Sequence, residues 1–245
     1  MTGGKLNPIT RSPASFDAAG SKFAWRSMSL GLTSPAMKHA VIALVISAAI
    51  AGSGRAAENE PGFVRLFDGE TFTGWRPAIE NSNTWRIEDG ALVTRGQRCH
   101  LFYVGDDMQF TNFHLKVEVM TEPDSNGGIY FHTQYQADGW PKRGFESQVN
   151  CTQGDWIKTG SLYGLVNLGA TPARDQQWWT QEIKVEGRKI TVLVDGAVVL
   201  QYIEPPGAQP GRDYERKLGA GTFALQAHDP KSVVRYRNLR VKRLD

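Results

Sequence analysis

The feature that most constrains the fold is a series of short alternating segments separated by turn residues, and it is clearest between residues 178 and 202. There the sequence WWTQEIKVEGRKITVLVDGAVVLQY alternates apolar and polar side chains in three segments. A Glu-Gly-Arg turn at 186–188 and an Asp-Gly turn at 195–196 separate them, and Asp-Gly is favoured where both turn residues need positive φ. Because alternating side chains lie on opposite faces of a strand, this stretch predicts a three-stranded meander.

The same pattern continues through most of the chain after residue 61. Every second residue of 113–119 is apolar, which predicts a half-buried antiparallel strand. Residues 84–94 predict a hairpin that turns at Asp89-Gly90. No stretch of ten or more residues in this region shows the 3.6-residue period of a helix, so the sequence predicts an all-β sandwich or jelly roll. Further strands are expected at 100–104, 161–166, 222–228 and 233–244.

In the last of these strands, simple alternation places Arg237 on the apolar face with Leu239 and Val241. A bulge that turns the arginine outward would remove the conflict. A partner that neutralises a partly buried arginine would do the same. We therefore expect Arg237 to have a structural role.

The first 57 residues are expected to lie outside the folded domain. Residues 37–57 combine a basic start, an apolar centre and a small-residue end, the three zones of a secretory signal. Their apolar run is about half the ~20 residues of a spanning helix, so a retained membrane anchor is the weaker alternative. Residues 1–36 are polar and aperiodic, which predicts a disordered extension or a start codon mis-assigned upstream of Met37. Residues 58–245 then form the domain of an exported protein, periplasmic or extracellular, with no stable membrane span after signal cleavage.

Charge and motifs argue against several classes of function. The net charge of +3 is small and the basic residues are dispersed, so nucleic acid is not an expected partner. The sequence lacks HExxH, paired CxxC, a glycine-rich phosphate loop and GxSxG, which argues against zinc proteases, nucleotide enzymes and serine hydrolases. Export would permit a disulfide between Cys99 and Cys151, but two cysteines so far apart in sequence are as well explained by unpaired, buried thiols, and the sequence leaves the pairing open.

The candidate site centres on residues 125–149, SNGGIYFHTQYQADGWPKRGFESQV, which predict two strands around a loop. Alternation puts Tyr130 and His132 on one face of the first strand. It puts Glu146 and Gln148 on one face of the second. Paired in one sheet, the strands would form a polar ledge backed by an apolar face. Such a ledge suits a sugar, so a carbohydrate is the expected partner.

Further candidate residues flank this ledge. His228 ends the segment 222–228 on its polar face, beside Gln226. Trp140 lies in the loop between the ledge strands and has the amphipathic ring that stacks well on sugars. Lys158, in the following loop, is a candidate substrate-binding residue. Each of these side chains taken singly is as well explained by hydrogen bonding or loop packing, and only their shared placement on non-core faces favours a site.

A glycosidase of the usual kind needs two carboxyl groups, and the ledge supplies one. Glu146 is accompanied by amides, whereas retaining hydrolysis needs two carboxyl groups roughly 5 Å apart. Asp155, Asp124 or Asp229 would have to reach across from loops. Conventional two-carboxylate hydrolysis is therefore an alternative that the residues do not favour.

Five segments then point to one family by their order and spacing: FVRLFDGETFTGW, SNGGIYFHTQY, GFESQV, TGSLY and TFALQAHDPKSVVRYRNLRV. On these segments, residues 61–244 resemble the 3-keto-disaccharide hydrolase domain family. The resemblance implies a concanavalin A-like jelly roll of two curved antiparallel sheets. It also implies cleavage of 3-keto-glycosides, by hydrolysis or by elimination followed by hydration. At the matching positions it implies functional roles for Glu146 and His228, whereas His132 stands where many relatives carry arginine.

The implied chemistry fits a site with few carboxylates. A ketone at C3 acidifies the proton on C2, so one base can start an elimination while donors or a metal stabilise the enolate oxygen. The hypothesis makes Glu146 or His228 the base. The other, or His132, would hold the enolate directly or through a divalent cation, the one cofactor considered. The alternative from another class is a lectin-like binding module of the same fold, with a sugar stacked on Trp140 or on the tryptophan pair at 178–179.

Overall fold

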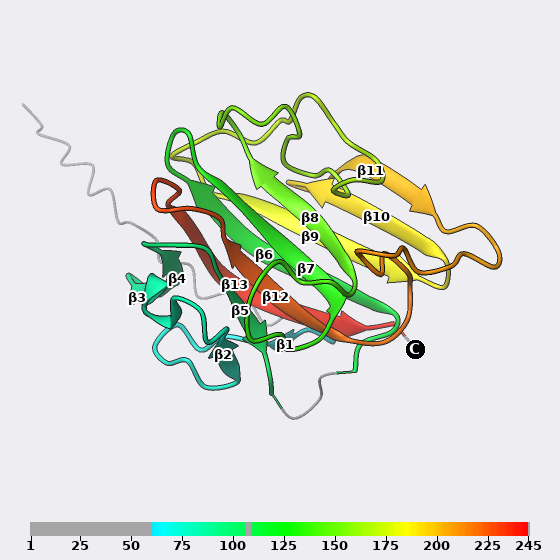
Figure 1. Ribbon diagram of the computed structural model, residues 1–245, viewed down its shortest axis with the longest axis horizontal. Helices are drawn as coiled ribbons and strands as arrows, with labels where there is room; N and C mark the ends of the chain where they lie inside the picture. The colour runs from blue at the N-terminus through cyan, green and yellow to red at the C-terminus, as the bar shows by residue number, and fades with distance from the viewer. Residues whose placement is uncertain (1–59, 106–108, 245) are drawn as a thin grey trace, which may run out of the picture. The chain divides into compact units, whose positions relative to one another are not determined.

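The computed structural model describes residues 60–105 and 109–244, which form two antiparallel β-sheets packed face to face (Figure 1). This arrangement confirms the all-β sandwich predicted from the alternating segments. The extension expected at 1–36 and the signal expected at 37–57 lie outside the described residues. In the described part of the chain, no helix has the length and apolar character needed to cross a membrane.

The larger sheet has the strand order β11-β10-β9-β6-β13-β4-β3, with β1 paired to β13. Its strands are β1 (Val64–Arg65), β3 (Trp85–Glu88), β4 (Ala91–Thr94), β6 (Phe113–Thr121), β9 (Trp179–Glu186), β10 (Lys189–Val194), β11 (Ala197–Ile203) and β13 (Val234–Arg243). The smaller sheet has the order β2-β5-β12-β7-β8. Its strands are β2 (Trp75–Pro77), β5 (Cys99–Tyr103), β7 (Asn126–Thr133), β8 (Phe145–Asn150) and β12 (Thr222–Ala227). A short 3₁₀ helix, η1 (Ser82–Thr84), precedes β3.

The core lies between the sheets and follows from the alternation in the sequence. Along β6, buried and half-buried residues alternate without a break, so one face of the strand packs inward. Phe113 of β6 contacts Phe131 of β7 and Phe223 of β12, with ring centroids 5.9 Å and 5.0 Å apart in edge-on arrangements, which aromatic pairs prefer. These contacts join the two sheets. Because each fully buried large apolar side chain contributes roughly 1.5–3 kcal/mol, such residues supply the main stabilising term.

The turns predicted from the sequence are present. β9, β10 and β11 form the expected meander, and β3 pairs with β4 in the expected hairpin. In that hairpin Asp89 and Gly90 both have positive φ, at 51° and 74°. This agrees with the reason for which an Asp-Gly turn was predicted.

β13 contains a bulge that resolves the conflict at Arg237. The register of β13 against β6 shifts between Arg237 and Arg240, and Asn238 has a φ of 51°. The side chain of Arg237 therefore meets Glu118 of β6, with Nε 2.7 Å from Oε2. The bulge and the pairing expected from the sequence are both found, and Arg237 has a structural role.

One predicted strand is wrong. Residues 161–166 form a tight turn, in which Leu162 makes single bridges to Ser147 and Val166. Gly164 in this turn has a φ of 73°, a left-handed conformation that ends extended structure. The cysteines, whose pairing the sequence left open, are both free, with Cys99 buried and Cys151 half-buried.

Three loops lie over the outer face of the smaller sheet, at 134–144, 151–178 and 204–221 (Figure 1). The amide of Tyr163 donates to the carbonyl oxygen of Glu146 at 2.9 Å and so ties the second loop to β8. The amide of Glu215 donates to the carbonyl oxygen of Lys142 at 2.6 Å and so joins the third loop to the first. The three loops therefore cover the polar outer face of the smaller sheet.

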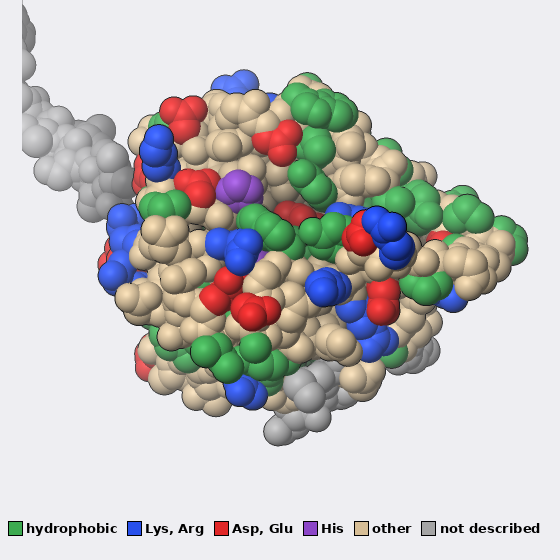
Figure 2. Space-filling view, viewed as in Figure 1, with side chains coloured by type: hydrophobic (Ala, Val, Ile, Leu, Met, Phe, Trp, Pro, Cys, Tyr) green, Lys and Arg blue, Asp and Glu red, His purple; other side chains and the backbone are tan. Residues whose placement is uncertain are grey.

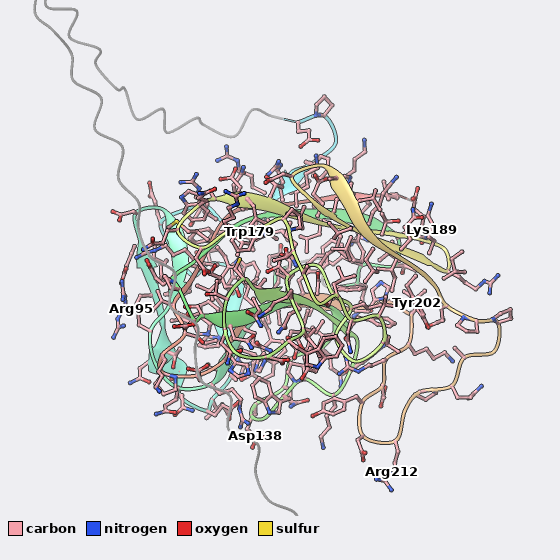
Figure 3. The ribbon with its side chains drawn as sticks, turned by 90° about the horizontal axis from the view of Figure 1, so that it is seen from above. Arg95, Asp138, Trp179, Lys189, Tyr202 and Arg212 are labelled. Atoms are coloured by element: carbon pink, nitrogen blue, oxygen red, sulfur yellow. The ribbon has the colours of Figure 1, made fainter. Side chains whose placement is uncertain are left out.

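The layers are separated clearly in a view from above (Figure 3). Trp179 and Lys189 of the larger sheet lie on one side of the sandwich. Asp138 and Arg212, from the first and third loops, lie on the other side.

Candidate functional site

The floor of the candidate site consists of cross-strand neighbours in the smaller sheet. Tyr130 of β7 is paired with Glu146 of β8, and Gly128 of β7 is paired with Gln148 of β8 and with Gln226 of β12. Because directly paired residues present their side chains on the same face, these polar groups lie together on the outer face. Gly128 leaves a gap in this set, since a Cβ there would lie 2.5 Å from Oε1 of Glu146. The glycine thus lets the Glu146 side chain reach across toward Gln226.

Glu146 is 5% exposed, and its hydrogen-bond partners are neutral. Tyr130 donates its hydroxyl to Oε2 at 2.7 Å, and Gln226 donates its amide to Oε1 at 2.9 Å. Gln148, with its amide nitrogen turned inward, donates to Oε1 at 3.1 Å. Burial raises the pKa of Glu146, and the hydrogen bond from Tyr130, the charge of Arg216 and the hydrogen bond from Gln226 offset this only in part. The carboxyl group is therefore held closer to its neutral form than an exposed glutamate.

Tyr130 and Gln226 complete this network. Burial, and then the neighbouring Glu146 carboxylate, raise the pKa of Tyr130 far above its ordinary value, so its hydroxyl keeps its proton. The hydroxyl donates to Glu146 and accepts from the amide nitrogen of Gln226 at 3.2 Å. The amide nitrogen of Gln226 therefore donates to both Glu146 and Tyr130.

His228, directly after β12, forms a pair with Asp229. Its Nδ1 lies 2.8 Å from Oδ2 of Asp229. Burial tends to raise the pKa of Asp229, but hydrogen bonds from Ser232 and His228 outweigh it and lower the pKa. Because an ionised carboxylate only accepts hydrogen bonds, Nδ1 of His228 carries a proton and Nε2 of the neutral ring carries a lone pair. Asp229 thus orients an imidazole that can act as a base.

These groups open into one cavity of about 510 Å³ including its mouth. The guanidinium of Arg216 brings a positive charge into it and lies over the rings of Tyr163 and Tyr214, at 5.8 Å and 5.2 Å. Figure 2 views this face, where hydrophobic side chains surround a hollow near a histidine. The lining residues are Asn126, Tyr130, Trp140, Glu146, Gln148, Asp155, Tyr163, Tyr214, Arg216, Gln226 and His228.

The structure brings most of the residues proposed from the sequence into this cavity. Trp140 lies at its edge, with its ring centroid 5.3 Å from that of His228 and the guanidinium of Arg98 5.0 Å from its ring. The convergence is the geometry that the sequence predicted, and the functional roles stay predictions. The residues concerned are Tyr130, Trp140, Glu146, Gln148, Gln226 and His228.

His132 does not line the cavity, and the prediction that it shares a face with Tyr130 is wrong. His132 has a φ of 53°, and this left-handed conformation breaks the alternation at the end of β7. Its ring packs against Phe113 and Phe131, at 5.5 Å and 5.7 Å, on the core side. Its Nε2 lies 3.0 Å from the carbonyl oxygen of Thr111. Burial lowers the pKa of His132 to about 4, which fits a neutral ring in a structural position.

Lys158 also lies outside the cavity lining. Its Nζ donates to the carbonyl oxygens of Gln153 and Asp155, each at 2.7 Å, so its charge holds the loop that carries it. The tryptophan pair at 178–179 offers no platform at this site. Trp179 is buried in the core, and Trp178 is covered by the guanidinium of Arg237 at 3.9 Å.

The donor set does not fit the divalent cation considered from the sequence. Among residues 60–105 and 109–244, no three His, Cys, Asp or Glu side chains gather where they could share a metal ion. Around Glu146 the glutamines turn their amide nitrogens, and not their oxygens, toward the carboxyl group, and Arg216 adds a positive charge. Divalent cations such as Mg²⁺ and Ca²⁺ take most of their protein ligands from carboxylate and carbonyl oxygens, so no cation enters the chemistry proposed below.

Sequence reasoning missed Arg216, Tyr163 and Tyr214. All three reach the cavity from loops, where no periodicity relates position in sequence to position in space. The one local signal is the segment 213–217, DYERK, where an aromatic ring and a cation occur together inside a loop rich in Pro and Gly. Asp155, considered only as a second carboxylate, does line the cavity.

Comparison with known proteins identifies the family. The sequence profile of a family described as the 3-keto-alpha-glucoside-1,2-lyase-like domain matches residues 62–242. The chain belongs to this family. The match confirms the resemblance seen in the sequence segments. A curated relative, a 3-keto-disaccharide hydrolase from Bacteroides thetaiotaomicron, is 33% identical over 81 residues, which cover 30% of this chain and 28% of the relative. The aligned part is thus little more than a quarter of that relative's length.

Solved structures extend the comparison of the fold. A candidate glycosyl hydrolase from Parabacteroides distasonis is 22% identical and superimposes with a TM-score of 0.63, over 75% of this chain and 94% of that one. A carbohydrate-binding module from Bacillus subtilis is 13% identical, with a TM-score of 0.50 over 69% and 95% of the two chains. At these identities the likeness concerns the fold, and it confirms the expected concanavalin A-like sandwich.

Proposed function

We propose that this protein is a carbohydrate-active enzyme that cleaves 3-keto-glycosides by elimination across C1 and C2, followed by hydration. One observation carries the proposal. A single buried carboxyl group with a raised pKa, that of Glu146, shares a cavity with His228. The contact with Asp229 at Nδ1 favours the tautomer of His228 that has its lone pair on Nε2. Such a site offers one acid and one base, as elimination requires. Family membership supports the same substrate class.

The proposed first step is removal of the proton on C2 by Nε2 of His228. The electron pair of the broken C–H bond forms a C2=C3 double bond, and the C3 carbonyl oxygen becomes an enolate oxygen, which the Arg216 charge stabilises. The carbonyl then re-forms, the pair moves into a C1=C2 double bond, and the C1–O bond breaks. Glu146 donates its proton to the departing oxygen. Water then adds its hydroxyl to C1 and its proton to C2, which gives net hydrolysis.

Turnover of 3-keto-trehalose and trehalose by the purified protein tests this proposal. We expect cleavage of the keto sugar alone, because the unoxidised sugar lacks the acidified C2 proton. Tight binding of either sugar without cleavage would instead favour the lectin-like module. Cleavage of trehalose that depends on Asp155 would favour a two-carboxylate glycosidase, since Asp155 is the other carboxylate in the cavity lining.

The proposal includes the compartment. The secretory signal predicted at residues 37–57 leads us to propose export to the periplasm or beyond. Expression of the full chain, fractionation, and N-terminal sequencing of the product test this. We expect a chain that begins near residue 57 outside the cytoplasm. An unprocessed chain confined to the cytoplasm would contradict export.

A further inference from the structure

The smaller sheet contains a buried histidine that the proposed chemistry does not use. His100 of β5 is fully buried, and neither of its ring nitrogens has a hydrogen-bond partner. Its ring lies edge-on against Tyr130 and Trp140, with centroids 5.3 Å and 5.6 Å away. Both neighbours line the cavity, so His100 lies directly behind the site. Buried polar groups without partners are rare in folded proteins and call for an explanation.

A second buried polar atom without a partner lies on the neighbouring strand. Gln226 is 2% exposed and donates its nitrogen to Glu146 and to Tyr130, while its Oε1 accepts from no group. Gln226 and His100 are direct cross-strand partners in the β5–β12 ladder. Directly paired residues have their Cβ atoms about 4.5–5.5 Å apart on the same face. The side chains that carry the unpartnered Oε1 of Gln226 and the unpartnered ring nitrogens of His100 are therefore neighbours.

No hydrogen bond joins the two side chains in this conformation. We propose that His100 is a positioning residue whose ring N–H, after rotation of the side chain, donates to Oε1 of Gln226 and so fixes the direction of that amide. An amide can turn over at small cost, and only one of its two orientations presents N–H groups to Glu146. The opposite orientation would place the amide oxygen against the carboxyl oxygen that it now serves. With His100 holding the oxygen, the nitrogen stays on Glu146 and Tyr130. The role of His100 in turnover rests on the function proposed above, whereas its effect on Glu146 does not.

The environment of His100 favours its neutral ring, which this role requires. Burial, with smaller effects from the charges of Arg98 and His228, lowers the pKa of His100 to about 3. The ring is thus neutral and carries one N–H donor. The ionisable groups that interact electrostatically with Glu146 are Tyr130, Tyr163, Arg216, His228 and Tyr236.

The test is the pKa of Glu146, followed through its side-chain carboxyl ¹³C signal in the full domain without substrate. In His100→Phe the ring packing is kept and the donor is lost. We expect the pKa of Glu146 to rise by roughly 0.5–1 unit, the size expected when one neutral hydrogen bond to a carboxylate is weakened. His100→Gln restores a donor and should return the value toward that of the wild type. His132→Phe is the matched control, because it removes another buried histidine, on the core side of the sheet. It should leave the pKa of Glu146 unchanged.

A double-mutant cycle with Gln226→Leu decides whether the effect passes through Gln226. We expect His100→Phe to shift the pKa of Glu146 no further once Gln226 has been replaced. Equal shifts in both backgrounds, or no shift with His100→Phe alone, would overturn the proposal. Because the signal is read without substrate, a protein that cleaves no 3-keto-glycoside would refute the proposed function and leave this result standing.

Discussion

The two outer faces of the sandwich hold buried or half-buried carboxylates in opposite surroundings. On the larger sheet, Glu182 lies 2.7 Å from Nε2 of His114 and 3.6 Å from Nζ of Lys116. The hydrogen bond from His114 is the main reason why the pKa of Glu182 is lowered. On the smaller sheet, Glu146 has neutral hydrogen-bond donors beneath a roof of loops, and burial raises its pKa.

The difference shows that partners decide what a carboxylate on a polar strand face does. Both residues lie on the non-core face of an alternating strand. The hydrogen bond from His114 and the charge of Lys116 favour the ionised form of Glu182, so Glu182 has a structural role. Glu146 has neutral hydrogen-bond donors and a raised pKa, so its protonated form is more accessible than that of an exposed glutamate. A shifted pKa of this kind is typical of a group that transfers protons. Each prediction below sets a change on one face against its counterpart on the other.

The largest effect is expected on catalysis. Glu146→Gln and His228→Ala should each lower kcat on a 3-keto-glycoside by about 10²–10⁴-fold, the usual contribution of a general acid or base. Glu182→Gln and His114→Ala remove the equivalent groups on the larger sheet and should leave kcat within a factor of about two, because neither lines the cavity. Steady-state kinetics on the four variants makes the comparison. Equal losses on both faces would contradict it.

A smaller but still clear effect is expected at the glycine gap. Gly128→Ala places a methyl group 2.5 Å from Oε1 of Glu146 and must displace that side chain. Overpacking of this kind costs roughly 1–3 kcal/mol of stability, and activity should fall by more than stability alone explains. Gly187→Ala is the control, because a Cβ there meets nothing within 4 Å, although its positive φ adds some strain. Urea unfolding and kinetics together measure both effects, and an active Gly128→Ala enzyme would contradict the placement of Glu146.

The dependence of stability on pH should have opposite signs for the two carboxylates. The lowered pKa of Glu182 stabilises the fold above its unfolded value near 4.5, and this contribution is lost as the pH falls through the folded value. The raised pKa of Glu146 means that the folded state holds its proton longer. Its favourable contribution is present below 4.5 and is lost as the pH rises from there. Each unit of difference between folded and unfolded pKa corresponds to about 1.4 kcal/mol.

Urea unfolding from about pH 4 to pH 8 separates these contributions. The free-energy difference between the wild type and Glu146→Gln should fall with rising pH. The difference between the wild type and Glu182→Gln should rise instead. Slopes of the same sign would show that the two carboxylates do not differ as described.

The smallest effect is expected for an ion pair on the larger sheet. Nζ of Lys184 lies 3.1 Å from Oε1 of Glu186, and the two side chains are 34% and 42% exposed. Lys184→Met should cost about 0.2–1 kcal/mol, as is usual for exposed pairs, and should weaken the salt dependence of unfolding. Activity should not change. A large loss of activity would mean that the larger sheet contributes to the site.

Much of the fold could be predicted because alternation is a local signal. The meander that forms β9, β10 and β11 and the inward face of β6 followed from it directly. The same signal placed Glu146 and Gln226 on the non-core face. It failed at His132, because a left-handed residue other than glycine inside a strand leaves no mark in the sequence pattern.

The rest of the site depends on contacts that no local pattern encodes. Arg216 lies at the cavity because backbone hydrogen bonds join Glu215 to Lys142 and Gly144 in another loop. These contacts link residues far apart in sequence, so no local pattern predicts them. Lys158 was a candidate for substrate binding in the sequence, yet its Nζ donates to carbonyl oxygens of its own loop. The pairing of His100 with Gln226 depends on strand register, which alternation within a single strand does not specify.

The central claim is that side chains on the outer face of the smaller sheet remove the proton on C2 of the substrate and that a proton from water later replaces it. Cleavage of a 3-keto-disaccharide in D₂O, stopped early and read by NMR and mass spectrometry, tests it most directly. The account predicts one deuterium at C2 of the released keto sugar, in an amount that exceeds exchange in the absence of enzyme and disappears with His228→Ala. Release of a sugar that keeps its original hydrogen at C2 would contradict the account, because the bond would then have been cleaved by direct hydrolysis.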